Sequence, residues 1–578
     1  MVRRGAALLG LLLLLPAGGG CKSKSLSSGP THVGAGATTP TRGGTLHFSI
    51  NDGIKSLDPQ VAYDEYSIYP LHYTMDTLIG YEKTMSPNAV GLIPQLATNI
   101  PVAEEHTMGH PVSGAEIKVW VYVFHLRDGI TFYDPTPPPG LGKVRPIEPR
   151  HFKYAIERCL DPDTSSPAQS FFEAIGGAPE MIARDGDNGP REAWGLVAQG
   201  RDLTIILTKP DPTLMYKLAM KFASPIEPEV VKHYGADGLN AHEVSSGPFY
   251  VTSYDRDIRI QFKKNPEYWD KNSIYLDGID MQLMVERQVG FMKFRARETD
   301  VVDRMTVQDL LAIGEEPAWQ PYLLRDKSID IYGERFDMTM KPFDDKRVRQ
   351  AFNYAINRDH LAQLGYGTML PAKGPLPPGM PGYNPELRGY PYDPAKAKAL
   401  LVEAGYPDGF ELDYFITGPD EKVEKIALSV QADMARVGVR LKIKRLTFPV
   451  HLSARMSAGK IPFGLDSWVQ DFPDPSNFLE FLFHSKYRAP TNSVNSSQYS
   501  NPEVDKLLDA AAIELDPARR MELYHQAEQL IVDDAPWVFE YHSVRVEARQ
   551  PWLMDYRMHP VWIRDFRHVW LDLPTRPR

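Results

Sequence analysis

The stretch best suited to chemistry lies near the end of the chain, at residues 466–479, which read DSWVQDFPDPSNFL. It combines acidic and aromatic side chains with two prolines. Such a composition disfavours a helix or an ordinary strand interior. The sequence therefore predicts a rigid polar and aromatic loop, and the carboxylate of Asp471 is its most conspicuous polar group.

Patterns that would indicate catalysis do not occur. The sequence has no Walker loop, G-x-S-x-G elbow, H-E-x-x-H helix or G-x-G-x-x-G turn. His233 and His242 lie near Glu243, but their spacing fits no standard zinc site. Asp533 and Asp534 point in different directions if they lie on a helix, so we expect a solvated helix end. The sequence therefore predicts a protein that is not an enzyme and that binds no metal or cofactor.

Bulk properties indicate a large, acidic globular protein. A chain of 578 residues exceeds one compact core and predicts two or more lobes. Its net charge of -10 argues against nucleic acid as a partner. The 50 prolines and 28 tyrosines suit a binding surface with ordered loops. Two cysteines, Cys21 and Cys159, predict no disulfide framework.

The amino terminus predicts export. Residues 1–21 have a basic start, an apolar run too short to span a bilayer as a mature helix, and small residues before Cys21. The pattern resembles a bacterial lipoprotein signal in which Cys21 is lipidated, although Gly18 stands where Leu is usual. A plain secretory signal cut nearby is the alternative. Residues 22–44 are polar and small, which predicts a flexible tether.

The hydrophobic patterns predict an α/β body. Strands are expected where apolar residues alternate, as at Ile258, Ile260 and Phe262, and helices follow Asp or Asn caps. The expected strands lie near residues 45–50, 119–126, 203–207 and 258–262. The expected helices lie near 149–160, near 348–356, between 393 and 405, and after Asn501 and Asp516. This mixture indicates sheets built from segments that are distant in sequence.

A series of motifs in fixed order covers residues 45–570. They read SLDP at 56–59, LIPQLA at 92–97, FHLRDGITF at 124–132, SGPF at 246–249, NPEYW at 265–269 and YDPAKA at 392–397. Together they resemble the oligopeptide/dipeptide-binding family of bacterial ABC-importer solute-binding proteins, family 5. The resemblance implies a two-lobed α/β fold, the class C periplasmic binding fold, whose lobes close around a ligand.

The resemblance also implies the division of the chain. The first lobe is expected at residues 45–330, with an extra subdomain at about 90–200. The second lobe is expected at 331–540, and residues 541–578 are expected to return to the first lobe.

The family stretch G-W-x-A-D-Y-x-D-P aligns with residues 467–475. In peptide-binding members its first acid holds the ammonium group of the ligand, which implies this role for Asp471. A buried ammonium group requires a charged hydrogen-bonding partner, so a fixed carboxylate suits it. The alternative for Asp471 is a turn-capping acid. No cation matches the residue that holds a ligand carboxylate in some members.

The same resemblance implies further ligand contacts. Trp468 is expected to form an aromatic wall, and the backbones of Ser467 and Val469 to bond an extended peptide. Tyr63 lies in the first loop that approaches the ligand, and Gly247 allows close backbone approach. The alternatives are lobe core for Trp468, plain surface for Tyr63 and a turn for Gly247.

The function implied is that of an extracytoplasmic, monomeric binding subunit. It captures peptides and delivers them to an ABC permease and ATPase, while a lipid anchor holds it at the membrane as a periplasmic or cell-surface lipoprotein. The same fold could instead take a metal chelate, haem, a sugar or a signalling peptide. An anchored hydrolase or a chaperone-like surface protein is a third possibility, and the missing catalytic patterns argue against the hydrolase.

Overall fold

The computed structural model of this chain describes residues 39–82, 90–186, 188–561 and 564–576. The expected signal segment, Cys21 and the tether up to residue 38 lie outside these residues. In the described part of the chain, no helix combines the length and apolar character that crossing a bilayer requires.

The N-terminal sheet has the strand order β1-β12-β11-β10 and a mixed topology. Its strands are β1 (Thr45–Ser49), β10 (Phe249–Asp255), β11 (Arg259–Lys264) and β12 (Gly278–Gln282), with β1 parallel to β12. Leu46 and Phe48 are fully buried, as their alternation predicts. Its core also contains the C-terminal residues Trp552, Phe566 and Leu571.

The predicted burial of one residue in the alternation at 258–262 is wrong. Ile258 was expected on the buried face with Ile260 and Phe262, but it is 67% exposed. It lies in the turn between β10 and β11, where its N–H donates to Asp255 O and the preceding Asp257 has φ +60°. The turn therefore interrupts the alternation one residue before the strand begins.

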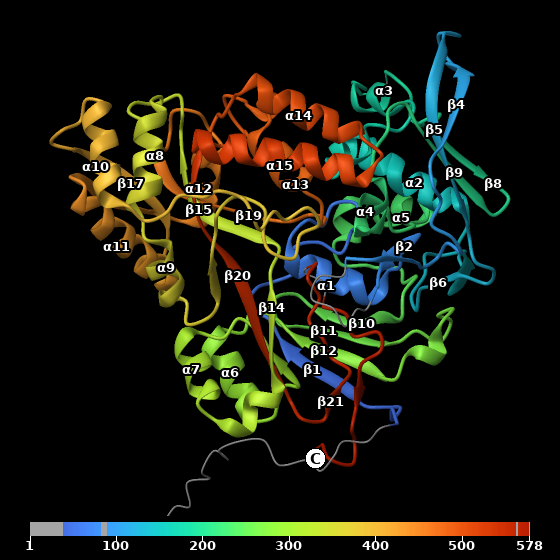
Figure 1. Cartoon of the computed structure of the whole chain (residues 1–578). Coiled ribbons are helices and arrows are strands. Elements are labelled where there is room, and N and C mark those ends of the chain that lie inside the picture. The colour runs from blue at the N-terminus through green and yellow to red at the C-terminus, as the bar shows by residue number, and fades with distance from the viewer. Residues whose placement is uncertain (1–38, 83–89, 187, 562–563, 577–578) are drawn as a thin grey trace, which may run out of the picture.

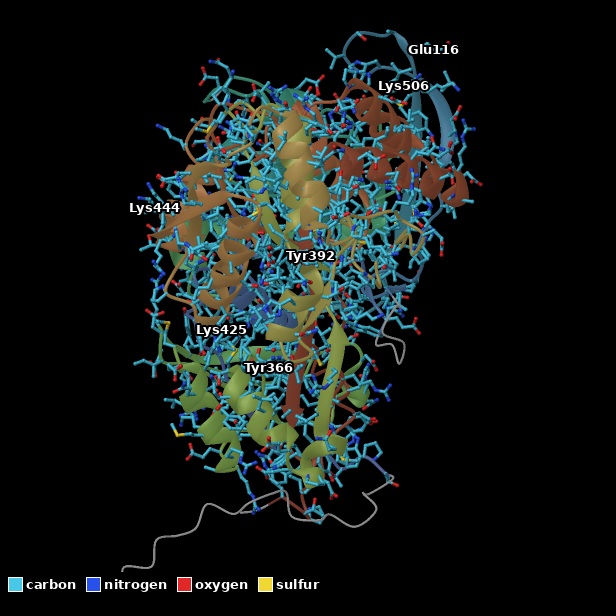
Figure 2. All side chains as sticks on the ribbon, turned by 60° about the vertical axis from the view of Figure 1, so that its left-hand side comes forward. Glu116, Tyr366, Tyr392, Lys425, Lys444 and Lys506 are labelled. Carbon is cyan, nitrogen blue, oxygen red and sulfur yellow. The ribbon has the colours of Figure 1, made fainter. Side chains whose placement is uncertain are left out.

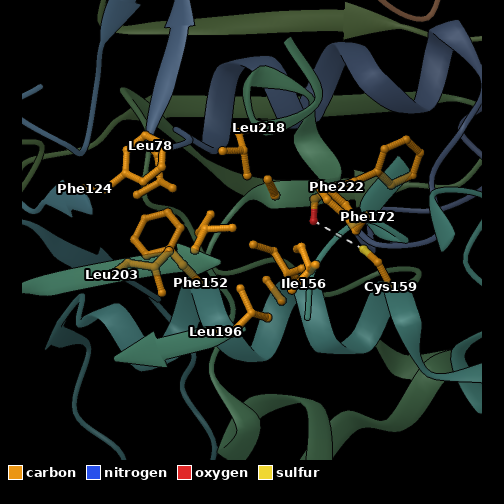
Figure 3. Packing of buried hydrophobic residues seen from close by; sticks show 14 of the residues in the cluster. Leu78, Phe124, Phe152, Ile156, Cys159, Phe172, Leu196, Leu203, Leu218 and Phe222 are labelled. Atoms are coloured by element: carbon orange, nitrogen blue, oxygen red, sulfur yellow. Dashed lines mark hydrogen bonds between the residues drawn. The ribbon is translucent and has the colours of Figure 1, made fainter. Parts of the chain in front are cut away.

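The arm sheet has the order β4-β5-β9-β8. It is formed by β4 (Glu104–Gly109), β5 (Glu116–His125), β8 (Leu196–Gln199) and β9 (Asp202–Leu207). The β4–β5 hairpin projects from the body, and Glu116 lies near its tip (Figures 1 and 2). Helix α2 (Pro149–Leu160) packs beneath it through Phe152 and Ile156, and the buried Cys159 thiol donates to Phe222 O (Figure 3).

The C-terminal sheet has the order β13-β20-β15-β19-β17-β18, with β14 and β16 also paired to β20. Its strands are β13 (Val301–Val302), β14 (Leu323–Lys327), β15 (Asp330–Phe336), β16 (Met369–Pro371), β17 (Phe410–Thr417), β18 (Val439–Leu446), β19 (Phe463–Val469) and β20 (Trp537–Arg549). β20 pairs with β15 through residues 537–541 and with β14 through 544–548. β20 therefore extends beyond its pairing with β15 toward α6 and α7, and passes the N-terminal sheet (Figure 1).

Four helices of the C-terminal half begin at the caps that the sequence predicts. Side chains of Asp345, Asp393, Asn501 and Asp516 accept hydrogen bonds from the first turns of α8, α10, α14 and α15. The helices are α8 (Lys346–Ala355), α9 (Arg358–Leu364), α10 (Pro394–Glu403), α11 (Glu421–Arg436), α12 (Phe448–Arg455), α13 (Ser476–Phe483), α14 (Pro502–Ile513) and α15 (Pro517–Asp534).

The remaining elements are short or lie around the N-terminal and arm sheets. They are α1 (Glu65–Thr74), β2 (Ile79–Tyr81), β3 (Leu92–Pro94), β6 (Thr131–Tyr133), β7 (Val144–Pro146), α3 (Ala178–Ile182), α4 (Leu214–Ala219), α5 (Pro228–Leu239), α6 (Arg287–Arg295), α7 (Val307–Gly314), β21 (Leu553–Met554) and β22 (Trp570–Leu571). Helix α1 lies at the centre of the molecule, between the N-terminal sheet and α15 (Figure 1).

The stretch 466–479 is not one continuous loop, which corrects the prediction. Its first residues belong to β19, which pairs with β15 along its whole length, and its last residues form the start of α13. Only residues 470–475 form a loop. Both prolines lie at or before the helix start, where proline does not interrupt a helix.

Helix α15 carries a buried acid, Glu528, on its apolar face. Leu376 N–H donates to one carboxyl oxygen, and burial raises the pKa of Glu528 to about 8 from 4.5. The folded state therefore holds this proton to higher pH than the unfolded state does. The stabilisation is complete below about pH 4.5 and is lost as pH rises to about 8.

We expect Glu528→Gln to remove this loss, because an amide stays neutral. We compare the free energy of unfolding of the variant with that of the wild type. Between pH 5 and pH 9 this difference should shift in favour of the variant by on the order of 2–4 kcal/mol. Urea unfolding at both pH values measures it, and Glu522→Gln on the exposed face of α15 is the control. Parallel pH profiles of variant and wild type would contradict the expectation.

Candidate ligand-binding site

A hydrogen bond joins Asp471 to Tyr63, which is distant from it in the sequence. Asp471 is 8% exposed and lies in the loop 470–475 between β19 and α13. The Tyr63 hydroxyl, just before α1, donates to Asp471 Oδ1 at 2.6 Å, although the two residues are 408 positions apart. The structure thus brings together two of the residues that the sequence selects.

Asn477, in the first turn of α13, holds the other side of Asp471. Its Nδ2 donates to Asp471 Oδ2 at 2.9 Å, and its Oδ1 accepts the backbone N–H of Asp471 at 2.8 Å. The same oxygen accepts the indole N–H of Trp468 at 3.2 Å. Asn477 is not among the site residues that the sequence predicts.

The carboxylate of Asp471 has hydrogen-bond donors but no cation. Burial raises its pKa, while the hydrogen bonds from Tyr63 and Asn477 act in the opposite direction. Within the described residues, no Lys, Arg or His lies within ion-pair distance of it. A buried carboxylate in this state favours a cationic group from outside the chain, because an unpaired buried charge is unfavourable.

The loop around Asp471 is held by two neighbouring residues. Asp474 receives two hydrogen bonds of 2.7 Å from the Arg520 guanidinium of α15, and both side chains are buried. Phe472 packs into the core of the arm sheet, with its ring 6.1 Å from that of Phe171. The loop is therefore fixed from two sides of the molecule.

Trp468 lies partly in the C-terminal core. Its ring stacks on Phe481 at 6.3 Å, and its indole N–H is bonded to Asn477. It is half-buried, so the structure places it beside Asp471 with one part of the ring packed against α13.

The outer edge of β19 is open beside this loop. Gln470 N–H donates to Ile329 O on the β15 side, so alternate residues Ser467 and Val469 direct their backbone groups to the other edge. There β17 pairs with β19 only at Gly464 among the described residues. The Ser467 N–H is bonded to Asp466, which leaves its carbonyl and the backbone of Val469 at an open strand edge.

A cavity of about 380 Å³ lies beside β15 and β20 and reaches the end of β19. Val469 and Gln470 line it, but Asp471, Tyr63 and Trp468 do not. Its walls come from opposite sides: Glu65 of α1 with α6 and α7, and residues of α9, α11, β15 and β20. Gln308 of α7 donates to Glu421 of α11 at 3.2 Å, which joins these two sides.

Lys422 is one of the basic residues that line this cavity. Its Nζ lies 4.6 Å from the Tyr541 ring centre, and no carboxylate of the described residues lies within ion-pair distance. Burial lowers its pKa, and the charges of Asp330 and Asp420 oppose that effect. Its neighbour Lys425 instead pairs with Glu421 and lies at the surface close to Tyr366 (Figure 2).

Gly247 lies apart from Asp471 and from the cavity. A Cβ atom there would stand 2.6 Å from the backbone carbon of Thr74, and its N–H donates to Thr74 O at 2.7 Å. Its close backbone approach is therefore to the end of α1, and its role as a ligand contact stays a prediction.

Known proteins resemble this chain in sequence and fold. The family model of bacterial extracellular solute-binding proteins, family 5, matches residues 116–489. Heme-binding protein A of Haemophilus influenzae is 31% identical over 78% of this chain and 81% of its own length. The dipeptide-binding protein of Escherichia coli is 28% identical over 78% of this chain and 82% of its length.

A solved structure agrees over nearly the whole chain. The ABC transporter-associated periplasmic binding protein DppA from Helicobacter pylori, in complex with the peptide STSA, superposes with a TM-score of 0.73 and 25% identity. The match covers 92% of this chain and 99% of that one.

The fold thus defines a two-lobed solute-binding protein. The chain belongs to the bacterial extracellular solute-binding proteins, family 5. The predicted family and the predicted two-lobed α/β fold are confirmed. This family comprises solute-binding proteins rather than enzymes.

Proposed function

We propose that this chain is the extracytoplasmic binding subunit of an ABC importer and that it captures short peptides. The observation that carries the proposal is the buried carboxylate of Asp471, which lacks a cation, next to the open edge of β19. A peptide supplies both complements, an ammonium group for Asp471 and backbone groups for the strand edge. The names of the dipeptide-binding relative and of the peptide complex support this choice.

The lobes are proposed to divide as the sequence predicts. Residues 45–330 with 541–578 form the first lobe, about 90–200 its subdomain, and 331–540 the second. The antiparallel strands β15 and β20 carry the chain between them, which supports a hinge there. Tyr63 then approaches Asp471 from the first lobe, and closure brings both sides onto one ligand.

The ligand is proposed to run from Asp471 along Ser467 and Val469 into the cavity. Trp468 forms an aromatic wall at its amino end, and Gly247 supports the loop after α1. The cavity of about 380 Å³ is of the size usual for small-ligand sites. Lys422 stands where an anionic group of the ligand would gain a partner.

Delivery is proposed to follow closure. The loaded protein docks on a membrane permease with its ATPase, works as a monomer, and stays at the membrane through a lipid on Cys21. No catalytic step is involved, and neither nucleic acid nor a cofactor takes part.

Native mass spectrometry of the protein, purified from its host's export compartment without refolding, tests the proposed ligand. We expect a series of bound masses that match peptides of two to five residues. A single bound haem, sugar or metal chelate would move the function to another solute, an outcome that the name of the Haemophilus relative makes relevant. An empty protein that also fails to bind a synthetic tripeptide library would contradict the peptide proposal.

A further inference from the structure

Asn477 joins three groups of the candidate site with one side chain. Its amide oxygen accepts from the Asp471 backbone and the Trp468 indole, and its amide nitrogen donates to Asp471 Oδ2. Both donors facing the oxygen are N–H groups, so the reverse orientation of the amide would place its NH2 against them. The network therefore fixes which end of the amide faces the carboxylate.

This bridge acts on both the backbone and the side chain of Asp471. A residue held at its N–H and at Oδ2 by one rigid amide has little freedom to rotate its carboxylate. Asn477 itself is fully buried in the first turn of α13, so its own position is set by packing. The loop 470–475 is anchored separately by Arg520 and Phe472, which means that Asn477 is not needed merely to hold the loop.

The carboxylate of Asp471 keeps hydrogen-bonding capacity for a ligand. Among the described residues, each of its oxygens accepts one hydrogen bond, from Tyr63 and from Asn477, whereas a carboxylate can accept about four. A fixed carboxylate discriminates strongly, because it cannot turn away to find water when a ligand brings no donor. A mobile carboxylate would give a smaller difference in affinity between ligands with a free amine and ligands with an amide.

We propose that Asn477 is the positioning residue that makes the site selective for a free amino group. It holds Asp471 and Trp468 in one arrangement before the ligand arrives. The inference rests on the proposed function and adds to it the group that sets the selectivity.

The test is the ratio of affinities for a synthetic tripeptide library and for the same library N-acetylated, measured by competition. Asn477→Asp keeps the shape of the side chain but turns the donor that faces Asp471 Oδ2 into an acceptor. We expect the affinity for the free-amine library to fall about tenfold or more, and the affinity for the acetylated library to change less than about twofold. The ratio between the two libraries therefore falls.

Asn495→Asp is the matched control. Asn495 is equally buried in the same half of the chain, and its amide bonds the carbonyls of His484 and Tyr499 and the N–H of Tyr499. It does not touch Asp471, so it should lower stability and leave the ratio unchanged. Asn477→Ser serves if Asn477→Asp does not fold, since its shorter side chain cannot bridge both groups of Asp471.

The outcomes separate the two proposals. A wild-type protein that prefers the free-amine library, with a folded Asn477 variant that keeps the wild-type ratio within about twofold, overturns the role of Asn477 alone. A wild-type protein that binds neither library, or both equally, overturns the ammonium site and the inference that depends on it.

Discussion

Asp471→Asn is expected to weaken binding of a tripeptide with a free amino terminus by about 2–5 kcal/mol. The change keeps the shape of the side chain and its contacts with Tyr63 and Asn477, and it removes the charge that compensates the buried ammonium group. Leaving such a group unpaired is what makes the effect large. Isothermal titration of variant and wild type at pH 7 measures it.

Two comparisons isolate this charge. The N-acetylated tripeptide should lose little affinity on the same substitution, because it has no ammonium group to pair. Asp413→Asn alters the net charge equally at a half-exposed position of β17, where the carboxylate lies 3.7 Å from Lys444, and should leave affinity unchanged. Equal affinity of Asp471→Asn and wild type for the free tripeptide would remove the ammonium site while leaving the fold in place.

Arg520→Ala is expected to lower the free energy of unfolding by about 3–5 kcal/mol. The guanidinium makes two hydrogen bonds of 2.7 Å to Asp474, and both side chains are buried. Its removal leaves the Asp474 carboxylate without its cation inside the protein. Because Asp474 lies in the loop that carries Asp471, ligand affinity should fall as well. Urea unfolding monitored by tryptophan fluorescence gives the stability difference.

The double variant Arg520→Ala with Asp474→Ala tests the cause. Removing both charges should recover part of the stability, since no unpaired charge remains. Arg519→Ala is the neighbouring control, because Arg519 is 77% exposed and its pair with Glu514 should contribute no more than about 1 kcal/mol. A double variant less stable than Arg520→Ala would show that packing, rather than charge, dominates at this position.

Helix starts were predictable because their signals are local. Asp393 and Asp516 accept hydrogen bonds from backbone groups three residues ahead, and a proline follows each. The pattern that marks such a cap lies within four residues and does not depend on the rest of the fold. The strand at 45–49 was similarly predictable, since one of its faces is buried and the alternation is short and regular.

Membership of a central strand was not predictable for Ser467 and Trp468. Their polar and aromatic neighbours suggest a loop, but pairing with β15 determines their conformation. That partner lies more than a hundred residues earlier, and no local pattern reports it. The predicted burial of Ile258 is wrong for the opposite reason. Here a local turn, in which Asp257 has a positive φ, interrupts an otherwise regular alternation.

The candidate site was partly predictable. The resemblance selects Asp471, and nothing near it in sequence indicates that Tyr63 would donate to it. Asn477 carries no signal of its own, since an Asn in a stretch rich in Pro, Asp and Ser usually indicates only a turn. Lys422 likewise follows a capping acid and resembles an ordinary helix residue until its place in the cavity is known.

The N-terminal sheet has a consequence for the order in which the protein acquires its structure. Its first strand emerges early in synthesis, but Trp552, Phe566 and Leu571 complete its core, and Arg576 bonds to Thr45 O. The face of that sheet therefore stays exposed until residues 552–576 have been made. The strand at 45–49 becomes stable only after these residues, about 500 positions later, have packed against it.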